Sequence, residues 1–269
     1  FRFLRLRWEV PEVHILYGDD PKRSTLSPCW VPMSKGGEYS LWWDDIHLAL
    51  NWHNNGSEIR NFFDQKGKLR SRPQNLESFF FEGATFPYRT TSAFGLRYMP
   101  PGCAFSVGGW GVFPPEGFSL YETLAIYNTR IARYFMEVLL GQGDASVSGT
   151  AARNHGAESV GGIPWPKDNL NSVVNKDVLK LVDLCAEINV DETCSNFVAP
   201  ACLIFKSKTL KESIYQFWIQ KCTFWREVSR VQRNIEQVVT NSYELSADEM
   251  DAIAKEEGQS LLEYKRGKM

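Results

Sequence analysis

The stretch FFEGATFPYRTTSAFGLR, residues 80–97, combines aromatic residues, hydroxyls and two arginines in a run that contains a single acid. Its residue types are typical of extended backbone. Hydroxyl and guanidinium groups along an extended backbone can donate hydrogen bonds to phosphates and to base edges. The same composition also suits an ordinary β-hairpin whose polar side chains face water, so this stretch alone leaves both interpretations open.

Positive charge is concentrated around this stretch, although the whole chain of 269 residues carries a formal net charge of −2. Residues 60–97 hold seven Lys or Arg against three Asp or Glu, whereas the segment after Asn241 is rich in acids. A nucleic-acid partner would therefore meet a local surface. We expect its contacts from Arg70 and Arg72 in a loop, and from strand residues Arg89, Thr90, Thr91 and Arg97. The alternative for each arginine is a solvated or ion-paired side chain.

The first part of the chain is predicted to be rich in strands. Alternating apolar residues predict a strand over residues 46–52, and Asn54-Asn55-Gly56 predicts a turn before a short helix over 57–65. Residues 66–75 form a basic loop. Further strands are expected over 76–82, 86–98 and 103–107, with Pro100-Pro101-Gly102 turning the chain between the last two.

The second part is predicted to be helical. Ser119 and Glu122 have the spacing of a capping box that opens a helix ended by Gly141, and Ser246 opens another in the same way. Apolar residues at helical spacing predict helices over 175–190 and 210–239. The Gly- and Ser-rich segment 141–162 favours a domain boundary. We therefore expect an α+β chain, with a mixed β-rich domain over 1–166 and a helical region over 167–269.

No catalytic or metal site stands out in the sequence. The six cysteines lack C-x-x-C spacing, so we expect no zinc site and reduced thiols, as in a cytoplasmic protein. Asp45 and His47 fall on one strand face and are expected to form a satisfied polar pair, and His155 is expected to be solvated. A hydrolase site that uses His47 or His155 remains a third alternative.

Targeting signals are also absent from the sequence. There is no secretory signal, and no apolar run approaches the ~18 residues of a membrane span, so we expect no membrane partner. The chain begins at Phe1 rather than Met, and we expect it to be part of a longer polypeptide.

Six short segments, in this order, resemble the C-terminal part of large adenine-specific DNA methyltransferases of bacterial defence. These families are the fused type II restriction–modification methylases and the phage-exclusion (BREX) methyltransferases. The segments are KGGEYS (35–40), FEGATFPYRTT (81–91), MPPGCAFS (99–106), LAIYNTR (124–130), GGIPWP (161–166) and YELSADE (243–249). The chain departs from the family at Val107-Gly108-Gly109, where an Asp-Lys-Gly often stands.

The resemblance implies a target-recognition module of a methyltransferase that modifies adenine at N6 with S-adenosylmethionine. The catalytic and cofactor motifs of the family would lie upstream in the same polypeptide, so no cofactor is expected in this chain. The family's chemistry flips an adenine out of double-stranded DNA, and this region would select it. Since DNA contacts vary with the target in these families, no base-reading residue can be carried over.

A protein-interaction scaffold is the alternative from a different class. In that case the long helix over 210–239 would dock a partner subunit, and the aromatic stretch would never meet DNA. The two hypotheses differ in their response to salt, because binding through several phosphates weakens steeply as ionic strength rises.

Overall fold

The computed structural model describes residues 2–18, 29–37, 39–71, 73–90, 93–140, 153–167, 170, 172–188, 192–195 and 197–257. Its contacts divide the chain into two compact units. Unit 1 comprises Phe1–Glu38, Asp45–Tyr88 and Tyr98–Phe113, and unit 2 comprises Tyr39–Asp44, Arg89–Arg97 and Pro114–Met269. The sequence predicts a DNA-binding domain over 1–166 and a helical region over 167–269, and this division stays a prediction.

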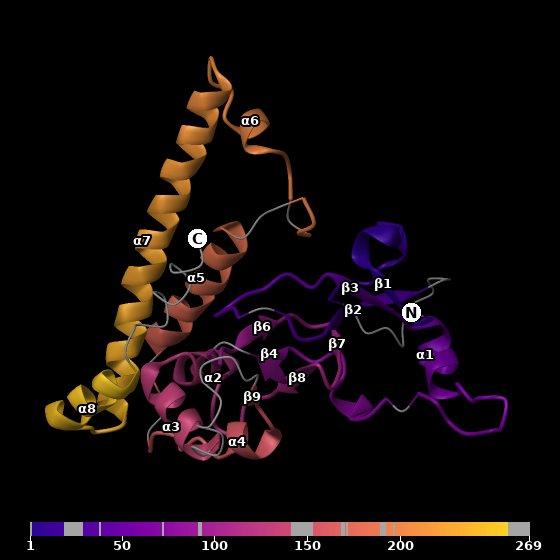
Figure 1. Cartoon of the computed structure of the whole chain (residues 1–269), viewed down its shortest axis with the longest axis horizontal. Coiled ribbons are helices and arrows are strands. Elements are labelled where there is room, and N and C mark those ends of the chain that lie inside the picture. The colour runs from indigo at the N-terminus through magenta and orange to yellow at the C-terminus, as the bar shows by residue number, and fades with distance from the viewer. Residues whose placement is uncertain are drawn as a thin grey trace. The chain divides into compact units, whose positions relative to one another are not determined.

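Unit 1 is built around a four-stranded sheet, labelled in Figure 1. The strand order is β1 (Leu4–Leu6), β3 (Leu48–Asn51), β2 (Trp30–Ser34) and β7 (Ala104–Phe105). β3 pairs antiparallel with both β1 and β2, whereas β7 runs parallel to β2. The predicted strand over 46–52 is thus confirmed as the inner strand β3.

The core of unit 1 is aromatic. Val31, Leu50, Trp52, Phe79 and Ala104 are all buried in one cluster. Each Trp and Phe removes a large apolar surface from water, which is the main favourable contribution to folding. The rings meet at tilted or edge-on angles, with the centroids of Phe79 and Phe105 5.0 Å apart.

A second sheet has the order β6 (Arg97–Met99), β4 (Gly83–Pro87) and β8 (Gly109–Val112). β4 and β8 are antiparallel, with Phe86 opposite Trp110. Close packing of the two sheets places Ser34 Oγ of β2 2.9 Å from Thr85 Oγ1 of β4. Gly36 has a φ of +58°, and a Cβ there would lie 2.7 Å from the carbonyl oxygen of Gly108, so only glycine fits.

The remaining elements of unit 1 are short. 3-10 turns cover Arg7–Glu9, Glu12–His14 and Leu76–Ser78. Helix α1 (His53–Arg60) begins with Asn54, Asn55 and Gly56 in the left-handed region, as expected for a turn that precedes a helix.

The expected strand over 76–82 is wrong. Its residues form the 3-10 turn and then a bend in which Phe80 has a φ of +73°. A strand would point Phe79 and Phe80 to opposite faces, yet both rings pack near Trp52, with centroids 5.8 Å and 5.3 Å from it. The bend is held by two backbone bonds, from Phe80 N to Cys103 O and from Gly102 N to Phe80 O.

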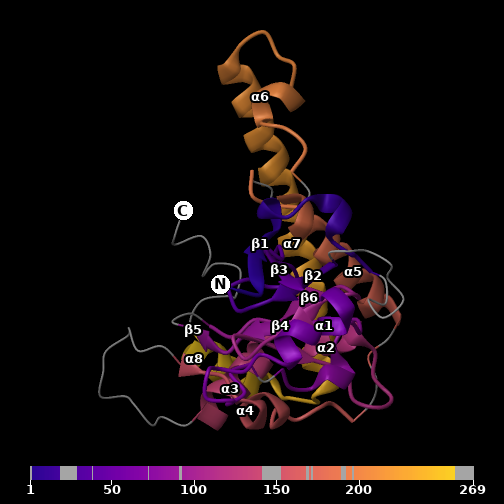
Figure 2. The same ribbon diagram turned by 90° about the vertical axis from the view of Figure 1, so that its right-hand side faces the viewer.

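Unit 2 is mostly helical. Figures 1 and 2 show the long helix α7 (Leu210–Ser242), with α5 (Ser172–Ile188) packed along it and α6 (Ala201–Ile204) against its N-terminal part. α2 (Leu120–Tyr127) packs on α5 and α7, and α3 (Arg130–Leu140) on α8 (Ala247–Glu257) and α4 (Ala157–Gly161). β5 (Arg89–Thr90) pairs with β9 (Arg153–Asn154). The chain is therefore α+β, as predicted.

The single helix expected between Leu120 and Gly141 is broken at Asn128 and Thr129. The side chain of Asn128 accepts a hydrogen bond from Leu96 N (2.8 Å) and donates one to Leu96 O (2.9 Å). These bonds fix Leu96 to the helices, and they require Asn128 to leave the helical path.

Gln232 of α7 joins this network. Its side chain donates to the carbonyl oxygen of Asn128 (3.0 Å) and accepts a bond of 2.7 Å from Trp42 Nε1. The short segments Tyr39–Asp44 and Arg89–Arg97 thus belong to the helical unit because their polar groups are satisfied there.

Candidate functional site

A short basic hairpin, residues 62–70, projects from unit 1. Its backbone pairs Arg70 N with Phe62 O and Asp64 N with Lys68 O. At the tip, Asp64 Oδ1 accepts hydrogen bonds of 2.9 Å from the backbone N–H groups of Lys66 and Lys68. The carboxylate of Asp64 thus shapes the turn, and the side chains of Lys66, Lys68 and Arg70 remain exposed.

The base of the hairpin is fixed by aromatic contacts. Phe62 packs edge-on against Phe3, with ring centroids 5.3 Å apart. The guanidinium of Arg2 lies 4.9 Å from the centre of the Phe62 ring. The hairpin therefore presents three cations on an anchored backbone.

Of the six residues expected to contact DNA, Arg70 is placed as expected. Its side chain is 56% exposed and lies in the basic hairpin, with Nε 3.7 Å from Asp64 Oδ2. An ion pair with this much solvent exposure contributes only ~0–1 kcal/mol to stability. The pair with Asp64 therefore does not prevent the guanidinium from binding a phosphate. Arg72, next but one along the chain, lies outside the described residues.

Arg89 and Thr90 lie in unit 2, on the two-residue strand β5. Arg89 is exposed and Thr90 is half-buried. Thr91 lies outside the described residues. The expected contacts are therefore divided between the two units, with Arg70 in one and Arg89 and Thr90 in the other.

Arg97 is buried, unlike a residue that meets DNA. Its exposed fraction is 2%, and its Nη1 donates to Asp44 Oδ2 within unit 2. Burial lowers the pKa of Arg97, and the nearby Asp44 carboxylate opposes that change. Because a buried guanidinium must be paired, Arg97 acts here as a structural partner of Asp44 and does not belong to the exposed basic surface.

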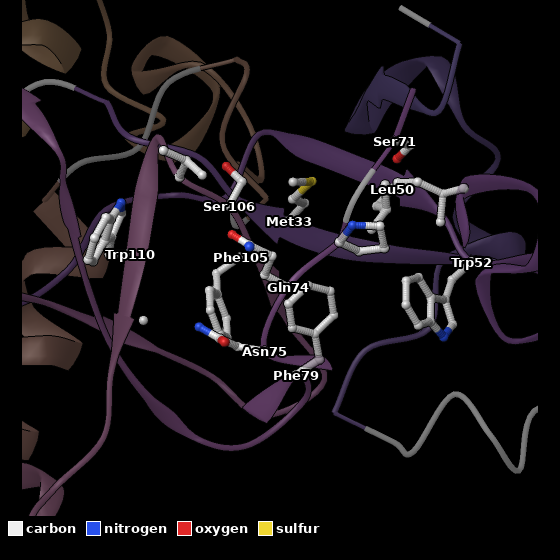
Figure 3. A pocket seen from close by; sticks show the side chains of 14 residues that line it. Met33, Leu50, Trp52, Ser71, Gln74, Asn75, Phe79, Phe105, Ser106 and Trp110 are labelled. Carbon is white, nitrogen blue, oxygen red and sulfur yellow. The ribbon is translucent and has the colours of Figure 1, made fainter. Parts of the chain in front are cut away.

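A pocket of about 300 Å³ opens in unit 1 (Figure 3). In this view Trp52 and Trp110 lie at opposite ends, and Met33, Gln74, Phe79 and Phe105 lie between them. The remaining lining residues are Leu50, Ile59, Ser71, Pro73, Asn75, Ser106, Val107 and Gly111. Among the residues that the structure describes, this lining contains no Lys, Arg, Asp, Glu or His.

Two features define the chemistry of the pocket. The first is the supply of rings, since Trp52, Phe79, Phe105 and Trp110 all line it. Trp110 is stacked on Tyr88 with an interplanar angle of 9° and a centroid distance of 5.6 Å. The second is a pair of neighbouring amides, Gln74 and Asn75, which are exposed in the segment that follows the basic hairpin.

The pocket was not predicted from the sequence, because its lining residues are far apart in the chain. The signals available were the two adjacent amides between Pro73 and Leu76, and the aromatic residues of segments 79–81 and 105–113. None of these has a spacing that indicates a pocket. The pairing of β2 with β7 brings Met33 close to Phe105, which follows in the chain only after more than 70 residues.

Two histidines considered as site candidates, His47 and His155, each pack against a neighbouring side chain. Asp45 Oδ2 lies 3.1 Å from His47 Nδ1, so the two side chains are paired as expected, but the contact lacks the geometry of a hydrogen bond. His155 is buried against Phe94, with ring centroids 5.2 Å apart, so the expectation of a solvated ring is wrong. Among the described residues no three His, Cys, Asp or Glu side chains gather as metal ligands.

All six cysteines lie in the described part of the chain, and the structure places no disulfide between them. Burial raises the pKa of Cys103 to about 12, so this thiol stays protonated and unreactive at neutral pH. Among the helices that the structure describes, none is long and apolar enough to cross a membrane.

Sequence comparison relates the chain to two bacterial methyltransferases, although no family model matches it. Over 134 residues, 49% of the chain, it is 36% identical to the adenine-specific methyltransferase BrxX of Escherichia coli O9:H4 (strain HS). Over 138 residues, 51% of the chain, it is 30% identical to the adenine-specific methyltransferase PglX of Lacticaseibacillus casei (strain Zhang). The matches cover 10% and 12% of these relatives, so the matched half of the chain spans about a tenth of their length.

Proposed function

We propose that this chain is the DNA-recognition part of an N6-adenine DNA methyltransferase that serves bacterial defence against phage. The observation that carries the proposal is the 36% and 30% identity to adenine-specific methyltransferases. In this proposal S-adenosylmethionine and the catalytic residues belong to an upstream domain of the same polypeptide. The partner of the chain itself is double-stranded DNA, in the cytoplasm.

The basic hairpin supports a role in DNA binding. Lys66, Lys68 and Arg70 are exposed on a backbone that Asp64 holds in shape. Exposed cations on an anchored loop neutralise phosphates and release counterions, which gives affinity that falls as salt rises. Such contacts position the protein on the duplex, and contacts to base edges then supply the specificity. Arg72, Arg89, Thr90 and Thr91 remain our candidates for further contacts.

Removal of the hairpin charges tests the proposal. We expect K66A/K68A/R70A to bind a duplex more weakly, and to lower the slope of log affinity against log salt by up to about 3, one for each cation that meets a phosphate. The measurement is fluorescence anisotropy with a labelled duplex at several salt concentrations. Circular dichroism checks that the variant is folded.

The matched control is K206A/K208A/K211A, which removes three exposed positive charges from unit 2. If both triple variants lost affinity equally, the effect would be one of net charge, and the hairpin would have no special role.

Selection from a randomised duplex library then tests recognition. Enrichment of a short motif that contains adenine is the result we expect.

A second candidate function is a scaffold that docks a partner protein through α7. The first turns of α7 expose Leu210, Ile214, Tyr215, Trp218 and Ile219, whose exposed fractions range from 43% to 64%. An exposed apolar stripe of this kind marks an interaction surface. Under this hypothesis the chain would bind no duplex at low salt, and the K66A/K68A/R70A variant would behave as the parent chain does.

A further inference from the structure

The basic hairpin carries an apolar pair among its cations. Phe63 and Leu69 lie opposite each other across its two strands. Their exposed fractions are 52% and 41%, so both rest partly in water, which is unfavourable for large apolar side chains. Single exposed apolar residues are common on protein surfaces. Two that face each other on a projecting hairpin form a small apolar surface, and such surfaces mark interaction sites.

The apolar pair faces away from the body of unit 1. Successive residues of a strand point to opposite faces. Phe62 packs on Phe3, so its neighbour Phe63 points away from that contact. Leu69 is the cross-strand partner of Phe63 and shares its face. The hairpin therefore presents an apolar face outward while its base stays fixed to unit 1.

The charges around the pair are complementary to a polyanion. Lys66, Lys68 and Arg70 are exposed. Asp64 is the one acid of residues 62–70, and its carboxylate is already engaged by the backbone of the turn and by Arg70, whose Nε lies 3.7 Å from it. An apolar face among cations matches a DNA groove, because phosphates line its walls and base edges form its floor.

The dimensions of the hairpin favour the major groove. Paired strands lie ~4.8 Å apart. The major groove of B-DNA is ~12 Å wide and admits a two-stranded ribbon, whereas the minor groove is only ~6 Å wide. Among the described residues nothing lies within 4 Å of the place where a Cβ on Gly67 would stand, so the tip of the hairpin is open to a ligand.

The major groove also offers an apolar group. Each thymine presents its C5-methyl group there, and contact with that methyl group is a known way for apolar side chains to read an A·T pair. The minor groove displays no such group.

We propose that the basic hairpin enters the major groove of DNA and that Phe63 and Leu69 contact thymine methyl groups on its floor. Lys66, Lys68 and Arg70 then bind phosphates on the walls of the groove. Phe63 and Leu69 are thus specificity-determining residues that favour A·T pairs at the contacted positions. This inference rests on the proposed function, and it adds base readout to a hairpin that otherwise binds phosphates.

The test removes the methyl groups from the DNA. Two duplexes of one sequence are compared, of which the first contains thymidine and the second deoxyuridine, which lacks only the C5-methyl group. We expect the full chain to bind the thymidine duplex roughly fourfold more tightly for each methyl group contacted, the gain for burying one such group. Fluorescence anisotropy at low salt measures both affinities.

Variants locate the methyl contact. F63S/L69S removes the apolar face and should bind the two duplexes equally. The control is V13S/F81S, which removes two exposed apolar side chains of unit 1 outside the hairpin and should keep the preference for thymidine. Circular dichroism and urea unfolding check that both variants are folded. The comparison of the two duplexes needs only the parent chain, so it decides the inference even if a variant does not fold.

The hairpin charges separate this inference from the proposed function. We expect K66A/K68A/R70A to bind both duplexes more weakly and to keep the ratio of their affinities, because the phosphates are the same in both.

Three outcomes would overturn the inference. Equal affinity of the parent chain for the two duplexes would refute the methyl contact, yet leave the proposed function standing if K66A/K68A/R70A still weakened binding. A preference for thymidine that F63S/L69S retained would refute the assignment of the contact to the hairpin. No binding to either duplex at low salt would refute both the inference and the proposed function.

Discussion

At the scale of single residues, unit 2 contains a largely buried carboxylate, Glu236, whose main partner is Arg130. Glu236 of α7 accepts hydrogen bonds from Arg130 N at 2.9 Å and from Arg130 Nε at 3.2 Å. Burial raises the pKa of Glu236, and the bonds from Arg130 lower it by less. The folded protein therefore holds the proton of Glu236 more tightly than the unfolded chain does.

This shift predicts a pH dependence of stability. Because the folded pKa of Glu236 lies above its unfolded value of 4.5, its contribution is fully present below pH 4.5 and is lost as pH rises through the folded pKa. Glu236→Gln keeps an acceptor for Arg130 and removes the titration. We expect the free energy of unfolding of the parent chain, minus that of the variant, to fall as pH rises above 4.5.

Urea unfolding at a series of pH values measures this difference. A difference that instead rose with pH would show that the attraction of Arg130 outweighs the cost of burial, and that the pKa of Glu236 is lowered.

The residue scale is also where the sequence is least informative. Arg70 and Arg97 occupy similar basic, polar stretches, yet the first is exposed and the second is buried against Asp44, 53 residues earlier in the chain. No local pattern encodes a partner at that distance. Charge composition found the region that carries the basic hairpin, but only tertiary contacts decide which cations face solvent.

At the scale of elements, helix starts are well encoded by local sequence. Ser119 Oγ accepts from Glu122 N, and the Glu122 carboxylate accepts from Ser119 N, as its spacing predicted. The same reciprocal bonds open α8 at Ser246 and Glu249. These contacts span three residues and need nothing from the rest of the fold.

A comparison of the two caps gives an element-scale prediction. The hydroxyl of Ser119 donates to Asn175 Oδ1 of another helix, α5, at 3.0 Å, whereas the hydroxyl of Ser246 donates to Glu249 Oε2 of its own helix at 2.7 Å. We expect Ser119→Ala to cost ~1–2 kcal/mol of unfolding free energy and Ser246→Ala ~0.5–1 kcal/mol, within the range for lost N-caps. Chemical denaturation of both variants tests this order. Equal costs would mean that the bond to α5 adds nothing measurable.

Strand boundaries were predicted less well than helix starts. Residues 86–98 contain parts of β4, β5 and β6 rather than one strand. Pro87 is the last residue of β4. At Gly95 the backbone packs so closely that a Cβ would lie 2.8 Å from the carbonyl oxygen of Ser40. Strands depend on partners that are distant in sequence, so alternation alone does not fix where they end. The long helix α7 was predicted because its apolar stripe is a local pattern.

At the scale of the whole molecule, the two units are interleaved along the chain. The helical unit takes two short segments, Tyr39–Asp44 and Arg89–Arg97, out of the β-rich half of the sequence. Trp42 is fully buried, and its Nε1 bonds to Gln232 of α7. A residue near the start of the chain is therefore part of the core of the C-terminal helices.

Trp42→Ala tests this interleaving. We expect it to cost ~3–5 kcal/mol, as for a large core side chain, and to increase amide hydrogen exchange in α2 and α7 rather than in β1–β3. Hydrogen exchange read by mass spectrometry measures the change for each element. Trp8→Ala, at a half-exposed tryptophan, is the control and should leave α7 unchanged. Faster exchange confined to unit 1 would contradict the assignment of Trp42 to unit 2.

The bond between Trp42 and Gln232 also sets a delay during protein synthesis. The two residues are 190 positions apart, and a ribosome that adds ~5–20 residues per second needs roughly 10–40 s to cover that distance. During this interval the indole of Trp42 has emerged without its final partner. The nascent chain therefore exposes an apolar segment that chaperones acting at the ribosome would bind, and unit 2 can complete its core only after α7 has left the ribosome.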